Sequence, residues 1–288
     1  MLVKSRSVEA DALVFDLEDS VAAHRKGAAQ SMVLQALRAM PSESPELCVR
    51  INAPSTDRTL SKSDLEVLLQ SGRLDTIVLP KFEDVEDAVT VAKAAAESST
   101  VTHPLSIIVS VESAFSLVHL KDLLQEAKER LASEFRDVAR IDAVLFASED
   151  YCAATGVKRT RSRTGLLYPR AQLVTVAKSM GLKAIDMVCV DYKDLKYLEE
   201  ECNEGLELGF DGKQAIHPAQ LKTIHREFSP SEHDIEEAKA IMEAYDNASR
   251  VKNQGAVGLE LGDRFIMIDA PMLLQAQRTL AYSKGIAV

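Results

Sequence analysis

Two carboxylates end apolar segments of the chain, where they could bind a metal ion. Glu112 ends the segment LSIIVSVE (105–112), and Asp150 ends IDAVLFASED (141–150). A carboxylate in apolar surroundings loses hydration, which is costly unless a cation or several hydrogen-bond donors meet it. Mg²⁺ prefers oxygen ligands and commonly takes only one or two protein carboxylates, leaving its other positions to water and substrate. Glu112 and Asp150 would meet the requirement if they shared such a divalent cation.

The other polar residues at segment ends extend this candidate site, and acids dominate the set. They are Asp16, Glu18, Asp19, Arg50, Asn52, Lys81, Glu149 and His217. The guanidinium of Arg50 is a rigid fork of donors that suits a carboxylate or a developing oxyanion. We predict that Arg50 takes part in catalysis and substrate binding. Glu18, Asp19 and Lys81 are predicted to contribute to substrate binding.

Each of these residues also has a purely structural interpretation. A single acid at a segment end, such as Glu112, is more often a helix cap or part of a surface ion pair. Asp19 or Ser20 could equally cap the helix that follows. His217 is more typical of a hydrogen-bonded loop histidine than of a base, and the basic run KRTRSR (158–163) is typical of a solvated loop, although it could meet phosphates. Residue types alone therefore indicate an acid-rich site that could depend on a metal.

Seven short apolar segments could position these residues. They cover 12–18, 46–52, 75–81, 105–112, 141–150, 183–190 and 209–218. Short apolar runs of this kind are typical of parallel strands buried on both faces. The stretches between them carry helical periodicity, and strict alternation of strand and helix predicts a parallel α/β sheet with right-handed crossovers. In a barrel of this kind the active site lies at the carboxyl ends of the strands.

A closed (β/α)₈ barrel has eight strands, and this sequence supplies seven. The chain opens with LVKSRSVEAD, which resembles the tail of a helix. We expect a TIM (β/α)₈-type barrel over residues 1–228 that lacks the first strand, through truncation or a mis-assigned start codon.

Residues 229–288 follow a different pattern and predict a helix-hairpin-helix extension. A long helix opens after a Ser cap, two short strands flank a Gly262-Asp263 turn, and a last helix runs from near Pro271 to Gly285. This extension is long enough to reach a neighbouring subunit and contribute to its site.

Composition narrows the class of protein. The chain has 44 acidic against 34 basic residues, a formal charge of −10, which disfavours nucleic acid and anionic membranes as partners. No apolar run approaches the ~20 residues that span a bilayer. Four scattered cysteines without a CxxC pair indicate neither a zinc site nor a disulfide framework. We expect reduced cysteines and an intracellular protein, mitochondrial or cytoplasmic.

An ordered series of motifs resembles a known family. The motifs are VFDLEDSV, VRIN, IVLPKFED, VESA, FASEDYCA, AIDMVCVDYKD, GFDGKQAIHPAQL, FSPSE and IDAPMLLQAQ. They stand in the order seen in the citrate lyase β-subunit family of the HpcH/HpaI aldolase superfamily, and are most similar to its citrate lyase β-like group, the citramalyl-CoA lyases. The resemblance extends from about residue 8 to residue 284.

The resemblance implies a Mg²⁺-dependent barrel that cleaves a carbon-carbon bond in a CoA thioester such as citramalyl-CoA or malyl-CoA. The products would be acetyl-CoA and a small 2-oxo acid, and malate-synthase-like activity is also allowed. By position, Glu112 and Asp150 match the family's metal ligands and Arg50 its substrate arginine. Asp269 matches an acid that acts as acid/base in the adjacent subunit's site. The implied assembly is a homo-oligomer, a trimer or a multiple of it.

Two departures leave other functions open. The family's first strand, with its Arg and VPG turn, is missing, and FASED stands where a glycine more usually precedes the acid pair. The alternatives are a citryl-carrier-protein lyase subunit, a 2-oxo acid aldolase, or a truncated non-catalytic paralogue.

Overall fold

The computed structural model describes residues 8–41, 43–252, 257–261 and 264–283. Its internal contacts divide the chain into two compact units, Met1–Leu221 and Lys222–Val288. The division falls at the start of helix α8 (Leu221–Phe228), whereas the predicted boundary lies at the other end of that helix.

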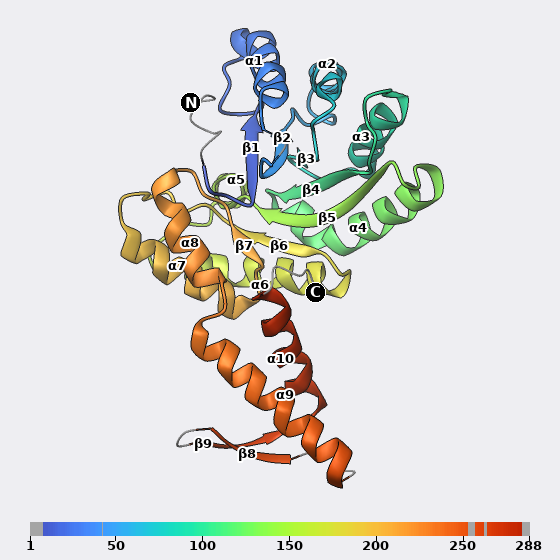
Figure 1. The fold of residues 1–288 in the computed structure, drawn as a ribbon. Helices are drawn as coiled ribbons and strands as arrows, with labels where there is room; N and C mark the ends of the chain where they lie inside the picture. The colour runs from blue at the N-terminus through green and yellow to red at the C-terminus, as the bar shows by residue number, and fades with distance from the viewer. Residues whose placement is uncertain (1–7, 42, 253–256, 262–263, 284–288) are drawn as a thin grey trace. The chain divides into compact units, whose positions relative to one another are not determined.

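The first unit is built on a curved sheet of parallel strands in the order β1 to β7 (Figure 1). The strands are β1 Ala12–Asp16, β2 Glu46–Arg50, β3 Thr76–Leu79, β4 Leu105–Val111, β5 Ala139–Phe146, β6 Lys183–Asp186 and β7 Gly212–Lys213. All seven predicted segments therefore contribute a strand. Within the described residues β1 and β7 are the two ends of the sheet, so it forms an open, barrel-type curve.

Helices alternate with these strands as predicted. They are α1 Lys26–Arg38, α2 Arg58–Leu68, α3 Val85–Glu97, α4 Ala114–Glu134, α5 Ser148–Thr155, α6 Thr164–Ser179 and α7 Leu195–Leu208, with 3₁₀ turns at Ala23–Arg25, Leu69–Ser71 and Pro218–Gln220. Figure 1 shows α1 to α4 following one another around the outer face of the sheet. Asp57, Asp84 and Ser113 begin α2, α3 and α4 by accepting a bond from a first-turn amide, which stabilises each start by about 1 kcal/mol.

Every strand ends before the segment that predicts it does, and β7 covers only Gly212–Lys213 of the segment 209–218. In the segment 141–150, β5 ends at Phe146 and Ser148 already begins α5. The helix ends at Gly156, whose φ of +74° is left-handed and suits glycine. Asp150 consequently stands in the first turn of a helix rather than on a strand.

The inner face of the sheet places a core directly beneath the polar segment ends. Side chains at i and i+2 of a strand share a face. Cys48, Val78 and Ile108 form a buried cluster with Ala143 and Leu145. Arg50 lies two residues beyond Cys48, and Glu112 lies four beyond Ile108, so both residues continue the same face above the apolar cluster.

The second unit contains α8 from Lys222 onward, helix α9 (Glu232–Lys252), an antiparallel pair β8 (Val257–Leu261) and β9 (Arg264–Ile268), and helix α10 (Ala270–Tyr282). Ala238, Ile241, Ile268 and Ala276 form its core. The predicted turn residues Gly262 and Asp263, and the predicted stop Gly285, lie outside the described residues.

Over the part of the chain that is described, no helix is long and apolar enough to cross a membrane. None of the four cysteines forms a disulfide with another described residue.

Candidate metal and substrate site

Arg50 is held by a carboxylate from the neighbouring strand. Parallel pairing sets Asp16 opposite Arg50, where Nε and Nη2 of the guanidinium lie 2.8 and 2.7 Å from the two Asp16 oxygens. Burial acts to raise the pKa of Asp16, but the Arg50 bonds and charge outweigh it and lower that pKa to about 2. Burial likewise acts to lower the pKa of Arg50, and the acids around it raise it instead. Arg50 is therefore a fixed cation with one edge of its fork already used by Asp16.

Glu18 joins Arg50 to Lys81. Its side chain is only 4% exposed, with Oε1 2.5 Å from Lys81 Nζ and Oε2 3.1 Å from Arg50 Nη1. Lys81 also lies 3.5 Å from the more exposed Asp19. The backbone of Lys81 is left-handed (φ +51°), a conformation that costs a non-glycine residue about 1 kcal/mol or more. Surrounding structure thus holds Lys81 in a strained conformation that brings its ammonium to Glu18.

The capping alternative for Asp19 and Ser20 is wrong. Helix α1 begins after Arg25 without a side-chain cap bond. Instead the Ser20 amide donates to Asp16 Oδ2 at 3.3 Å, which ties the loop after β1 back to its own strand end.

A second set of hydrogen bonds, which no sequence pattern indicated, fixes the loop after β1. Lys26 Nζ donates to the carbonyls of Leu17 and Glu18 and to Asn52 Oδ1, each at 2.7 Å. Asn52 in turn donates to buried Asp64 from both its backbone and its side chain. No sequence signal distinguished Lys26 from a surface lysine, because its three acceptors come from the loop ends of two strands.

Glu112 is the exceptional residue of the site. It is 4% exposed, and neither carboxylate oxygen has a hydrogen-bond partner in the described chain. Helix α4 is capped by the next residue, Ser113, so Glu112 is neither a helix cap nor half of a surface ion pair. A buried acid without a partner is expensive, and this one requires a ligand or a proton.

The pKa of Glu112 reports the same shortage. Burial and, to a smaller extent, the charges of Asp150 and Glu18 together raise it to about 7. The Ser110 side chain and the Lys81 backbone act to lower this pKa. Neither group makes a hydrogen bond of ordinary geometry to a Glu112 oxygen. The carboxylates of Asp150 and Glu18 thus lie near enough to Glu112 for their charges to disfavour its ionised form.

Asp150 supplies the second oxygen donor. It is half-buried in the first turn of α5, near enough for its charge to act on Glu112. An unpartnered buried carboxylate beside a second carboxylate fits a hard cation with oxygen ligands. Among the residues that the structure describes, no group of three or more His, Cys, Asp or Glu is arranged to hold a metal. A cation here would take its remaining ligands from water and substrate.

Comparison with known proteins identifies the family. Residues 1–218 match the model described as HpcH/HpaI aldolase/citrate lyase. The chain belongs to this family. The resemblance inferred from the sequence motifs is thereby confirmed.

Named relatives of this family member are lyases. Mitochondrial citramalyl-CoA lyase of Homo sapiens is 33% identical over 287 residues, which cover 98% of this chain and 82% of the relative. Citrate lyase subunit beta of Escherichia coli (strain K12) is 30% identical over 285 residues, 98% and 88% of the two chains. A crystal structure of protein CitE from Mycobacterium tuberculosis, in complex with magnesium, acetoacetate and coenzyme A, is 27% identical, with a TM-score of 0.71 over 96% of this chain and 90% of the other. The family is therefore one of enzymes.

Asp269 lies in the other unit of this aldolase/citrate lyase family member. It begins α10, where its side chain accepts a bond from the Met272 amide at 3.2 Å, and it is exposed. Its predicted role in a neighbouring subunit stays a prediction.

Two arginines of the basic run are paired with acids. Arg159 pairs with Glu149 and Glu201, and Arg163 pairs with Glu204 at 2.6 Å. Both arginines are largely buried, so the solvated-loop interpretation is wrong for them.

His217 is a hydrogen-bonded loop histidine, as predicted. Its Nδ1 accepts a bond from the Ala219 amide at 3.1 Å, and its ring stacks on Tyr192 with centroids 4.7 Å apart. Its position is thus explained by local structure.

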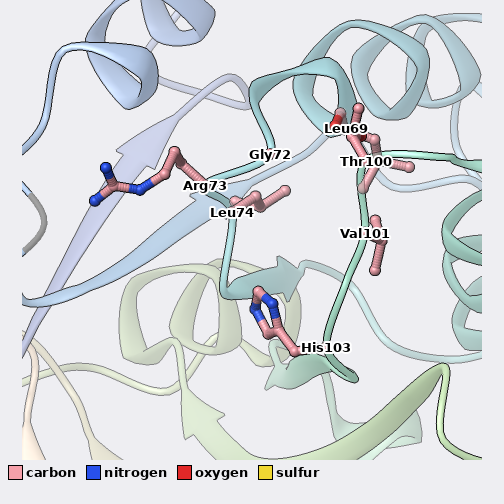
Figure 2. A pocket seen from close by; sticks show the side chains of 7 residues that line it. All are labelled: Leu69, Gly72, Arg73, Leu74, Thr100, Val101 and His103. Carbon is pink, nitrogen blue, oxygen red and sulfur yellow. Dashed lines mark hydrogen bonds between the residues drawn. The ribbon is translucent and has the colours of Figure 1, made fainter.

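A small pocket lies away from the candidate site, at the amino ends of β3 and β4. Leu69, Gly72, Leu74, Thr100 and Val101 line it together with Arg73 and His103 (Figure 2). The Arg73 side chain points away from Thr100 and Val101 and donates to the carbonyls of Met40 and Pro41. The cavity volume of about 10 Å³ is at the lower limit for a single water molecule, so this pocket is no substrate site.

Proposed function

We propose that this chain is a Mg²⁺-dependent carbon-carbon lyase that cleaves a 3-hydroxyacyl-CoA, citramalyl-CoA or malyl-CoA, to acetyl-CoA and a 2-oxo acid. The observation that carries the proposal is the unpartnered, buried carboxylate of Glu112 facing Asp150. The names of the relatives and the magnesium and coenzyme A complex of CitE support it.

Glu112 and Asp150 would hold the Mg²⁺ ion. When bound, Mg²⁺ supplies a Lewis acid and a template for the 2-oxo acid half of the substrate. Arg50, kept cationic by Asp16 and Glu18, stabilises the negative charge that develops on the thioester enolate as the bond breaks. Glu18, Asp19 and Lys81 complete the substrate side of the site, with Lys81 offering an ammonium toward the carboxylate of the substrate.

Asp269 of a neighbouring subunit is proposed as the acid/base. Its carboxylate takes the proton of the substrate hydroxyl, the carbon-carbon bond breaks, and the electron pair passes to the enolate of acetyl-CoA, which is then protonated. Its exposed position at the start of α10 supports this role. The proposal requires a homo-oligomer, a trimer or a multiple of it, and an intracellular location.

The test is an assay of the purified chain with Mg²⁺ on citramalyl-CoA, on malyl-CoA, and on glyoxylate plus acetyl-CoA. We expect cleavage of the CoA thioesters and none of the corresponding free hydroxy acids. Equal cleavage of the free acids would favour a 2-oxo acid aldolase, and activity only with a carrier-protein thioester would favour a citrate lyase subunit. Tight Mg²⁺ binding without any turnover would point to a non-catalytic paralogue.

Asp269→Asn isolates the acid/base step. Asparagine still caps a helix, so the fold of α10 should be retained. We expect Mg²⁺ affinity to stay unchanged while kcat falls by roughly 10²- to 10⁴-fold, the usual contribution of general acid-base catalysis. Unchanged kcat would remove Asp269 from the mechanism. A mixture of Asp269→Asn and Arg50→Ala chains should regain activity, since intact sites then form across the subunit boundary.

A further inference from the structure

Arg159 links three segments that are far apart in the chain. Its Nη1 donates to Ser148 Oγ at 3.0 Å and to Glu149 Oε1 at 2.5 Å, both in the first turn of α5. Its Nη2 donates to the Val188 carbonyl, beyond β6, at 2.6 Å and to Glu201 Oε1 on α7 at 3.0 Å. One guanidinium therefore joins α5 to α7 and to the loop after β6.

The α7 end of this link is anchored in the interior. Glu201 is fully buried and also lies 3.1 Å from Lys213, at the end of β7. Lys213 lies 3.4 Å from Asp186, which two donors of buried Arg170 hold. A chain of alternating charges thus runs from the carboxyl ends of β6 and β7 to Arg159, whose own side chain is only 10% exposed.

The α5 end of the link lacks the usual means of fixing a helix start. Helix α5 has only eight residues, and Ala147 at its N-cap position makes no side-chain cap bond. Short helices are marginal without external support. The bonds from Arg159 to Ser148 and Glu149 supply that support, and the residue that follows them is Asp150.

We propose that Arg159 is a positioning residue for Asp150: it fixes the first turn of α5 so that the Asp150 carboxylate meets the ion that Glu112 requires. The inference rests on the proposed function. Partners that orient metal ligands typically change metal affinity 10- to 100-fold when removed. The role depends on the guanidinium, whose two Nη atoms donate to opposite sides of the link. The single ammonium of a lysine cannot reach acceptors on both sides at once.

Calorimetric Mg²⁺ titration of the apo full chain tests the proposal. Arg159→Lys keeps the charge beside Glu201, and we expect it to raise the Mg²⁺ dissociation constant by roughly 10- to 100-fold. Hydrogen exchange of the α5 amides should rise in the same variant. The matched control is Arg161→Lys in the same loop, since Arg161 is 60% exposed and pairs with Asp194 and Glu200 of the α7 region. We expect its Mg²⁺ affinity to equal that of the wild type.

A double variant, Ser148→Ala with Glu149→Gln, covers the case in which Arg159→Lys fails to fold. It removes the α5 partners while leaving Arg159 bound to Glu201 and Val188, and it should lose Mg²⁺ affinity in the same direction. A folded Arg159→Lys chain, or this double variant, that binds Mg²⁺ within twofold of wild type would overturn the positioning role, even if its melting temperature fell. Failure of the wild type itself to bind Mg²⁺ would instead refute the proposed function.

Discussion

Two groups of buried charged side chains lie at the carboxyl ends of the same sheet, and they differ in whether their acids are paired with cations. Beyond β6 and β7, Arg159, Arg170, Asp186, Glu201 and Lys213 pair with one another. Although burial acts to raise the pKa of Glu201, Lys213 and Arg159 outweigh it and lower that pKa.

Beyond β4, by contrast, burial raises the pKa of Glu112 to about 7 because no cation pairs with it among the described residues. The first group is complete within the chain and acts as scaffold. The group around Glu112 lacks a partner for its buried carboxylate, which requires a ligand or a proton from outside the protein. The pairing of a buried acid, rather than its burial, therefore separates a ligand site from a structural ion pair.

The largest effect should come from breaking the paired group. Asp186→Ala leaves Arg170 and Lys213 buried without their shared acid, and removing one partner of a buried pair costs about 3–5 kcal/mol. Chemical denaturation at pH 7 measures the free energy of unfolding. The control, Lys62→Ala in the exposed pair with Glu66, should change it by less than about 1 kcal/mol. A loss below 1 kcal/mol in Asp186→Ala would show that the network is not structural.

Neutralising the unpaired acid should have the opposite sign. Because the pKa of Glu112 is raised from 4.5 to about 7, the folded apo protein holds a proton that the unfolded chain has lost, and stability falls as pH rises between these values. Glu112→Gln should therefore stabilise the apo protein at pH 8 by on the order of 3 kcal/mol, and much less at pH 4.5. The same variant should bind Mg²⁺ more weakly. Equal unfolding free energies of mutant and wild type at pH 8 would contradict the unpaired state.

Asp16 gives a smaller effect within the candidate site. Its pKa of about 2 lies below the ordinary 3.8, so its contribution is present above pH 3.8 and is lost as pH falls toward 2. Asp16→Asn should cost about 2 kcal/mol at pH 7 and less at pH 2.5. Denaturation at both pH values measures the difference, and a cost that does not depend on pH would mean that the Arg50 pair is not its source.

The sequence predicted the scaffold well because the signal is local. Seven apolar runs gave seven strands, and the residues at their ends, from Asp16 to Glu112, lie where parallel strands bring them together. The predicted segment 141–150 runs past the end of β5, because a short helix start, Ser148 to Asp150, resembles the polar end of a strand.

Pairing could not be predicted from the sequence. Arg159 and Glu201 are 42 residues apart, and Lys26 and Asn52 are 26 apart, so nothing local shows that they meet. The same limit applies to Glu112, whose lack of a partner is a property of every element around it.

A crystal structure of the chain soaked with Mn²⁺ in place of Mg²⁺ tests the central claim most directly, because the anomalous signal of manganese locates the ion independently of the protein model. We predict one peak ligated by both Glu112 and Asp150, which disappears in Glu112→Gln crystals. An ion bound elsewhere, or an ion that contacts neither carboxylate in crystals of an active enzyme, would contradict the account.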